Sequence, residues 1–198
     1  MIITFNFLFR ILTIFLFLLG RFYWIITEPV ANREKPKTTS KGIIKLYHRL
    51  RRLVFPITEI ILFLQLLGWQ ILPFSKQLFV MQVMGFMLVL IGVDMAIFAR
   101  KELGTNWVPA AEYQVKKDQE LVTTGIYKYI RHPIYFSAVL SITGGELVAQ
   151  SYLAFIGLVL LVGGYRQARN EEKLLIGHFG SAYKNYMKRT KMFIPFLW

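Results

Sequence analysis

The chain has 198 residues and a net charge of +13, 55% of its residues are hydrophobic, and it contains no cysteine. Without cysteine it can form neither disulfides nor thiolate metal or catalytic sites. Apolar runs of roughly 18 or more residues indicate membrane spans. The basic residues cluster beside these runs, so anionic lipid and the positive-inside rule explain the charge better than nucleic acid does. The sequence therefore predicts an all-α integral membrane protein that contacts the lipid bilayer and binds no nucleic acid.

Five apolar runs follow one another and predict about five transmembrane helices. They are Ile2–Ile26, Leu53–Leu72, Leu78–Ala99, Ile134–Ala149 and Tyr152–Tyr165. The last two are short and are divided by Gln150 and Ser151, so we expect a tight helical hairpin over residues 134–165. Glycines within the hairpin would let its helices approach closely. These glycines are Gly144, Gly145, Gly157, Gly163 and Gly164.

Basic residues predict the orientation of the chain in the membrane. Thr27–Arg52, Arg100–Pro133 and the tail from Arg166 hold almost all of them, whereas the turn Pro73–Gln77 has a single lysine, Lys76. By the positive-inside rule the two loops and the tail are cytoplasmic, and the N-terminus lies outside. Trp69, Trp107 and Trp198 suit the membrane interfaces, and Glu146, near the tip of the hairpin, is expected to face the outer interface.

We expect one membrane domain over residues 1–198. Its first part, 1–99, holds three spans and the basic cytoplasmic loop 27–52, which comprises a polar stretch, Glu28–Gly42, and an interfacial helix, Ile43–Arg52. The second part, 100–198, holds the hairpin and the cytoplasmic C-terminal helices. These helices are predicted to be amphipathic Arg166–Phe179, ended by Gly180, and the short basic Ser181–Thr190.

The most informative stretch is Leu121–Tyr135, LVTTGIYKYIRHPIY, between the third and fourth apolar runs. Proline suits the first turn of a helix, and the residue before it is pushed toward an N-cap conformation. His132 is therefore predicted to cap a membrane helix that begins at Pro133. Helix starts attract anions, and Arg131 adds a charge there. The alternative is that Arg131 and His132 only mark the membrane surface.

A second informative stretch places two adjacent acids, Glu171 and Glu172, where the chain leaves the membrane. Acids favour the first turn of a helix, which accounts for one of them. The functional interpretation turns one glutamate into a site opposite Arg131 and His132. There it would bind the amino group or ribose hydroxyls of a ligand.

Four segments together resemble the isoprenylcysteine carboxyl methyltransferases and their prokaryotic relatives. They are GIYKYIRHPIY (Gly125–Tyr135), EEKLL (Glu171–Leu175), FGSAY (Phe179–Tyr183) and the final Ile194-Pro195. The resemblance covers the C-terminal half of the chain in motif-level detail. Over the N-terminal half it rests on the number of spans alone.

This resemblance implies a membrane-embedded S-adenosylmethionine-dependent methyltransferase, of EC 2.1.1 type, that holds its cofactor in a cytoplasmic pocket with a lateral opening to lipid. It implies carboxyl O-methylation of an isoprenylcysteine-like or other lipid-like substrate. Separately, three scattered histidines without cysteine predict no metal site. A carboxylate is already ionised at neutral pH, so the protein has only to position the reactants and exclude water. The family's cofactor contacts fall on Gln119, Leu121, Val122, Tyr127, His132, Tyr135 and Glu171.

The family's substrate-orienting arginine falls on Gln167 in this chain, with Arg166 and Arg169 on either side. Successive helical residues turn by about 100°. Arg166 is therefore rotated by about 100° from Gln167 around the helix, whereas Arg169 is rotated by about 200° and points toward the opposite face. We therefore predict Arg166 as the catalytic arginine.

Other functions are weighed against this one. A phospholipid or amine N-methyltransferase would use the same cofactor but needs a base. NADPH-dependent sterol-type reductases also carry Arg-His-Pro-x-Tyr, although they usually have more spans, and Ile134 here replaces a usual Asn. A non-catalytic membrane protein is the last option. The location would be the cell membrane in a prokaryote or the endoplasmic reticulum in a eukaryote. The methyl acceptor and the oligomeric state stay open.

Three ionisable residues lie inside the first three predicted spans. Arg21, Glu59 and Asp94 are each six residues from the expected cytoplasmic boundary, which is roughly 9 Å of helix. Charges inside spans tend to face the bundle and pair. We predict that Arg21 pairs with Glu59, Asp94 or both, the alternative being that each reaches the interface separately.

Overall fold

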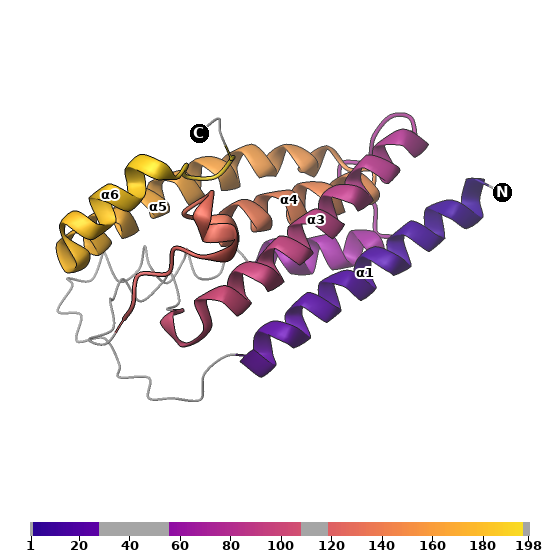
Figure 1. Cartoon of the computed structure of the whole chain (residues 1–198). Helices are drawn as coiled ribbons and strands as arrows, with labels where there is room; N and C mark the ends of the chain where they lie inside the picture. Colours follow the sequence, from indigo (N-terminus) through magenta and orange to yellow (C-terminus); the bar gives the residue numbers. More distant parts are fainter. Residues whose placement is uncertain (1, 28–55, 108–118, 196–198) are drawn as a thin grey trace, which may run out of the picture.

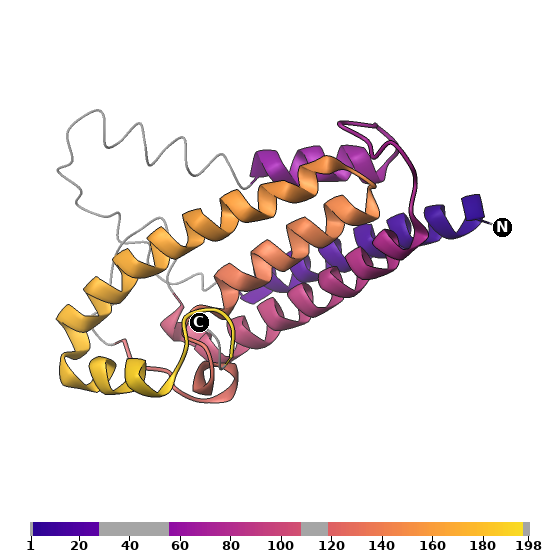
Figure 2. The ribbon, with the colours of Figure 1, turned by 90° about the horizontal axis from the view of Figure 1, so that it is seen from above.

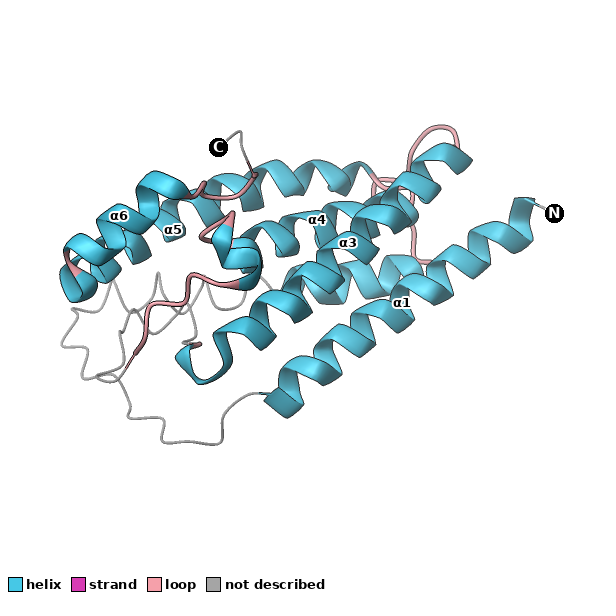
Figure 3. Ribbon diagram, viewed as in Figure 1, coloured by secondary structure: helices cyan, strands magenta, loops and turns pink. Residues whose placement is uncertain are grey.

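The computed structural model describes residues 2–27, 56–107 and 119–195, and these ranges contain helices and loops but no strand (Figure 1, Figure 3). Figure 1 labels the main helices: α1 (Ile2–Thr27), α3 (Phe79–Leu103), α4 (Pro133–Val148), α5 (Ile156–Phe179) and α6 (Ser181–Arg189). A further apolar helix spans Pro56–Leu66. Short 3-10 helices are η1 (Gly104–Asn106), η2 (Gly125–Lys128) and η3 (Tyr152–Phe155). The predicted all-α fold is confirmed.

The long helices lie roughly parallel in an elongated bundle, and α4 lies between α3 and α5 (Figure 1, Figure 2). Helix α1 packs along α3, and α6 turns back against the end of α5. One hydrophobic core cluster joins the helix Pro56–Leu66 to α4 and includes Leu62, Leu66 and Ile142. The C-terminal halves of α1, α3 and α5 extend toward the same end of the bundle as the N-terminus of α4 (Figure 1).

The backbones of α3 and α4 approach each other closely at glycines. A Cβ on Gly85 would lie 2.5 Å from the carbonyl oxygen of Gly144, and the reverse contact is equally short. A Cβ on Gly92 would lie 2.4 Å from the Ser141 hydroxyl. Of the expected hairpin glycines, Gly157 does pack closely on Thr143 of α4. The prediction missed that the α3 glycines are the main partners of α4.

The remaining hairpin glycines behave differently from the prediction. Gly145 packs against Leu62 of the helix Pro56–Leu66, a Cβ on Gly164 would make an ordinary 3.7 Å contact, and a Cβ on Gly163 would meet nothing within 4 Å.

We expect Gly144→Ala to lower the melting temperature in detergent, although alanine is the better helix former by about 1 kcal/mol. The new methyl group would push against the backbone of Gly85, which cannot move aside alone. Gly163→Ala is the matched control, because its methyl group meets open space and should leave stability unchanged or raised. Equal effects in a thermal-shift assay would show that α3 and α4 do not pack this closely.

Two stretches, Asn6–Thr27 and Phe79–Asn106, are long and apolar enough to cross a membrane. Helix α1 leaves Phe7, Phe15 and Phe22 at least 60% exposed, and α5 exposes Leu158 and Val159 to a similar degree. Unpartnered apolar faces of this extent are typical of helices that contact lipid. The count of five spans stays a prediction.

Several predicted boundaries are wrong. The second run was expected to stay helical to Leu72, but its helix ends at Leu66, followed by the positive φ of Gly68 (114°). Helix α3 continues past Ala99 to Leu103. The expected break at Arg166 is absent, because α5 runs unbroken from the apolar hairpin into the polar tail. A helix keeps its backbone hydrogen bonds whether its side chains are apolar or charged, so the change in composition did not end it.

Gly180 ends α5 with φ 57°, as predicted. The polar stretch Glu28–Gly42, the interfacial helix Ile43–Arg52 and Trp198 lie outside the described residues.

Glu146 corrects another expectation, because it is 1% exposed instead of facing the outer interface. Gln65 Nε2 donates to its Oε2 at 2.6 Å, which supplies the partner that a buried carboxyl needs. Beside it, the side chain of Gln150 bonds both the N–H and the C=O of Leu78 at 2.9 Å. These polar contacts hold the α4–α5 turn against the start of α3.

Candidate cofactor and acceptor site

The chain after α6 fixes the backbone that leads into α4. Ile130 and Lys191 form an isolated parallel bridge. The N–H of Arg131 donates to the Lys191 carbonyl at 2.8 Å, and that of His132 donates to the Met192 carbonyl at 3.0 Å. Two segments that are distant in the sequence are thus held side by side, and the Arg131 and His132 side chains are directed toward α5.

His132 occupies the N-cap position of α4, and Pro133 is in its first turn, as predicted. The buried imidazole makes no capping hydrogen bond. Its Nδ1 instead lies 3.5 Å from Glu171 Oε2, and its Nε2 lies 3.4 Å from Glu172 Oε1. The histidine therefore links the start of α4 to both acids of α5, and does more than mark the membrane surface.

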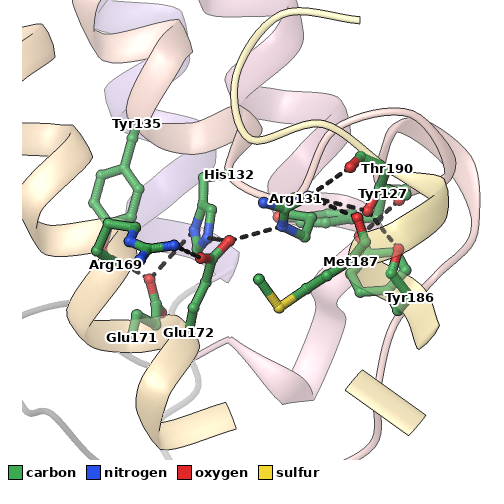
Figure 4. Close-up of polar contacts among 10 residues, drawn as sticks. All are labelled: Tyr127, Arg131, His132, Tyr135, Arg169, Glu171, Glu172, Tyr186, Met187 and Thr190. Carbon is green, nitrogen blue, oxygen red and sulfur yellow. Dashed lines mark hydrogen bonds and ion pairs between the residues drawn. The ribbon is translucent and has the colours of Figure 1, made fainter. Parts of the chain in front are cut away.

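Arg131 joins three parts of the chain through its guanidinium (Figure 4). Its Nε donates to Glu172 Oε1 at 2.7 Å, and its Nη1 donates to the Thr190 carbonyl at 2.6 Å. The side chains of Arg131 and Glu172 are only 9% and 2% exposed. A buried charge pair of this kind is tolerated because each charge compensates the other.

The electrostatics of the cluster favour its charged form. Burial alone would raise the pKa of Glu172, but His132 and Arg131 outweigh it and hold that pKa below its ordinary value. Burial alone would lower the pKa of His132, but the carboxylates of Glu171 and Glu172 outweigh it and raise that pKa. An ionised Glu172 and a protonated His132 therefore stabilise each other.

The two adjacent acids have different surroundings. Glu172 is buried and holds Arg131, whereas the Glu171 side chain is 35% exposed and lines a cavity. The hydroxyl of Tyr135 donates to Glu171 Oε2 at 3.1 Å. The expectation that one glutamate turns into the site opposite Arg131 and His132 agrees with this arrangement, and the second glutamate anchors it.

The cavity has a volume of about 510 Å³ and is lined by residues of α1, α3, α4 and α5, of the helix Pro56–Leu66 and of the segment before α4. It brings together every residue that the resemblance assigned to the cofactor. They are Gln119, Leu121, Val122, Tyr127, His132, Tyr135 and Glu171. We call this side of the cavity the α5 side. The lining also includes residues of α1, of the helix Pro56–Leu66 and of α3, and we call this part of the wall the α1 side. Among them are Phe17, Arg21, Trp24, Glu59, Val93 and Ile97.

The predicted catalytic arginine is not part of this lining. Arg166 is exposed, whereas its neighbour Gln167 is buried and lines the cavity. Arg169 does not point away from the site as expected, because its Nη1 lies 3.8 Å from Glu172 Oε2. A role for Arg166 in catalysis stays a prediction.

The sequence pattern of the phospholipid methyltransferase family matches residues 80–182, which is just over half of the chain. The chain belongs to this family. A protein-S-isoprenylcysteine O-methyltransferase of Dictyostelium discoideum is 30% identical over 129 residues, covering 64% of this chain and 54% of that protein. The Homo sapiens protein of the same name is 27% identical over 167 residues, which cover 83% of this chain and 58% of that protein. The chain thus spans a little over half the length of these relatives.

A solved structure has a similar fold. It is the eukaryotic intramembrane Ras methyltransferase ICMT, with a TM-score of 0.59 and 18% sequence identity, covering 88% of this chain and 60% of that one. The family match includes α3, α4 and α5 and therefore most of the cavity wall.

The predicted pairing of span charges is wrong within the described residues. Arg21 and Glu59 line the same cavity and their charges interact, but no ion pair within 4 Å joins Arg21 to Glu59 or to Asp94. Asp94 is exposed instead. Their common depth in the spans correctly indicated that Arg21 and Glu59 lie near each other. Depth alone does not specify the direction of a side chain, so it could not exclude Asp94.

Sequence reasoning also missed the role of Arg100, which stands at the start of the loop after the third span. It is 2% exposed, its Nη1 donates to the Gly104 carbonyl at 2.8 Å, and its Nη2 donates to the Thr27 carbonyl. Its guanidinium lies over the Trp107 ring, 4.7 Å from the centroid. Because Trp24 and Trp107 both line the cavity, Arg100 positions this part of the wall.

The pKa shifts predict how stability depends on pH. Because folding raises the pKa of His132, the protonated imidazole stabilises the folded state. This stabilisation is fully present below about pH 6.5, the ordinary pKa of histidine, and is lost as pH rises through the pKa in the folded protein. The lowered pKa of Glu172 contributes stability above about pH 4.3 that is lost as pH falls through its folded pKa. In His132→Gln, the melting temperature measured as a function of pH should fall less between neutral and basic pH than it does in the wild type. An unchanged profile would contradict the interaction of His132 with Glu171 and Glu172.

Proposed function

We propose that this chain is an S-adenosylmethionine-dependent methyltransferase that O-methylates the carboxylate of an isoprenylcysteine-like or other lipid-like acceptor at the membrane. The observation that carries the proposal is the composition of the cavity. The residues assigned to the cofactor line its α5 side, and largely apolar residues line its α1 side. The two relatives named protein-S-isoprenylcysteine O-methyltransferase support the choice of acceptor class.

The residues present fit the proposed cofactor. A volume of about 510 Å³ lies within the range of roughly 300–1,000 Å³ that is typical of small-molecule sites. The partly exposed carboxylate of Glu171 can bind an ammonium group or ribose hydroxyls, and Tyr135 and His132 fix its orientation. When bound, S-adenosylmethionine supplies an electrophilic methyl group on a sulfonium.

The work left to this chain is positioning. Its apolar wall excludes water, and an ionised carboxylate acceptor needs no proton removed before it attacks. Amine N-methylation is the second candidate, favoured by Glu59 in the cavity wall, which could take the proton from an ammonium group.

Calorimetry on the detergent-purified chain tests the proposed class. S-adenosylhomocysteine should bind with one site per chain, and NADPH should not. Binding of NADPH alone would favour a sterol-type reductase, and binding of neither ligand would favour a non-catalytic membrane protein.

We further propose five spans with the N-terminus outside and the cofactor site in the cytoplasm. The absence of cysteine allows a direct test, because single introduced cysteines are the only thiols. Lys76 and Lys184 are both exposed and lie in the turn before α3 and in α6. A membrane-impermeant maleimide should label Lys76→Cys on intact cells and Lys184→Cys only after permeabilisation. Labelling of both from the same side would contradict this topology.

A further inference from the structure

The described lining of the cavity contains three basic side chains, Arg21, Arg131 and His132. Two of them are engaged within the protein. Arg131 holds Glu172 and Thr190, and His132 lies against both glutamates of α5. For Arg21, no hydrogen bond or ion pair is found with any part of the chain that the structure describes. Arg21 is thus the basic group in this wall that keeps its donors for a ligand.

The surroundings of Arg21 favour an anionic ligand. It projects from α1 six residues before Thr27, roughly 9 Å inside the helix end, beside the apolar side chains of Phe17 and Val93. Arg21 is exposed, so its guanidinium is accessible to a ligand, and a cation inside an expected membrane span is costly unless it meets an opposite charge. Glu59 influences Arg21 electrostatically but lies beyond ion-pair distance, so it does not occupy the guanidinium.

We infer that Arg21 binds the carboxylate of the methyl acceptor. This inference rests on the proposed function and names the group that recognises the substrate. A guanidinium matches the geometry of a carboxylate with two parallel hydrogen bonds. Bound there, the acceptor's tail lies along Phe17, Val93 and Ile97, and its carboxylate shares the cavity with the cofactor that Glu171 binds.

Apart from Arg131 and His132, which are engaged within the protein, the described lining on the α5 side contains no cation for this task. Gln167 lines the cavity but is neutral, and Arg166 and Arg169 are absent from the lining. Specificity for a charged acceptor therefore depends on α1, a helix that lies outside the segment matched by the family pattern.

The test compares two probes that differ only at the carboxyl group. N-acetyl-S-farnesylcysteine carries a carboxylate, and its carboxamide does not. Their affinities are measured by calorimetry on the detergent-purified full chain, without cofactor. The wild type should bind the carboxylate about tenfold more tightly or better, as expected for a charged hydrogen bond. Arg21→Met should abolish the preference, Arg21→Lys should keep part of it, and the affinity of both variants for S-adenosylhomocysteine should change less than about twofold.

Arg10→Met is the matched control. Arg10 is on the same helix, eleven residues earlier, which places it on nearly the same face and about 16 Å away. It is absent from the cavity lining and should leave the preference intact. The inference is overturned if Arg21→Met keeps the preference, or if Arg10→Met loses it equally.

The inference is also overturned if the wild type prefers S-farnesylcysteamine, an amine, and Glu59→Gln removes that preference. Failure of the wild type to bind S-adenosylhomocysteine would reject the proposed function alone, because the comparison of probes needs no cofactor.

Discussion

Arg131→Met is expected to destabilise the protein more than any other single substitution in the site, by about 3–5 kcal/mol. Its removal leaves the carboxylate of Glu172, 2% exposed, without its closest partner. It also removes the hydrogen bond to the Thr190 carbonyl that ties the chain after α6 to the start of α4. The melting temperature in detergent should fall sharply.

A matched control for Arg131→Met is available in the same cluster. Arg169 approaches the same carboxylate at 3.8 Å, but its side chain is 54% exposed, so Arg169→Met should cost less than about 1 kcal/mol. Adding Glu172→Gln to Arg131→Met should restore part of the loss, because no buried charge is then unpaired. Equal losses for the two arginines, or no restoration in the double variant, would show that the buried pair does not support the fold.

The second large effect concerns the cofactor. Glu171→Gln should weaken S-adenosylhomocysteine binding by about ten- to one-hundredfold, because a charge-assisted contact is worth about 1.5–3 kcal/mol. Glutamine can still accept the hydrogen bond from Tyr135, so the variant should fold. His132→Ala should weaken binding in the same direction, since the imidazole lines the cavity and orients Glu171.

Asp94→Asn is the corresponding control for Glu171→Gln. It makes the same change of charge on the exposed face of α3, away from the cavity, and should leave the affinity unchanged. If neither Glu171→Gln nor His132→Ala changes the affinity measured by calorimetry, the cofactor does not bind at this wall.

Local signals were enough to predict the parts of the fold that depend on backbone chemistry. Pro133 predicted the start of α4 correctly, because proline fixes φ near the helical value. Gly180 predicted the end of α5 correctly, because glycine readily adopts the positive φ that ends a helix. The division between Tyr165 and Arg166 failed because it was inferred from hydropathy alone. Polarity reports where a helix leaves lipid, and it does not report where a helix ends.

Contacts between distant segments were beyond local signals. The sequence indicated that one of the two acids faces the ligand, but the assignment of Glu172 to a structural role depends on Arg131, which Thr190 in turn orients. The packing of Gly85 on Gly144 likewise joins two helices whose pairing follows from the tertiary fold. The depth of Arg21 in the first span singled it out in the sequence. Its place in the cavity wall could not be predicted, because it depends on how the helices around the cavity are arranged.

Transfer of a labelled methyl group tests the central claim most directly. The purified chain is incubated with S-adenosylmethionine labelled on its methyl group and with N-acetyl-S-farnesylcysteine, and the lipid product is then treated with mild alkali. The proposed carboxyl O-methylation predicts label in the lipid that alkali releases as volatile methanol, because a methyl ester is hydrolysed under these conditions. Absence of label in the lipid from a chain that binds S-adenosylhomocysteine, or label that resists alkali, would contradict it.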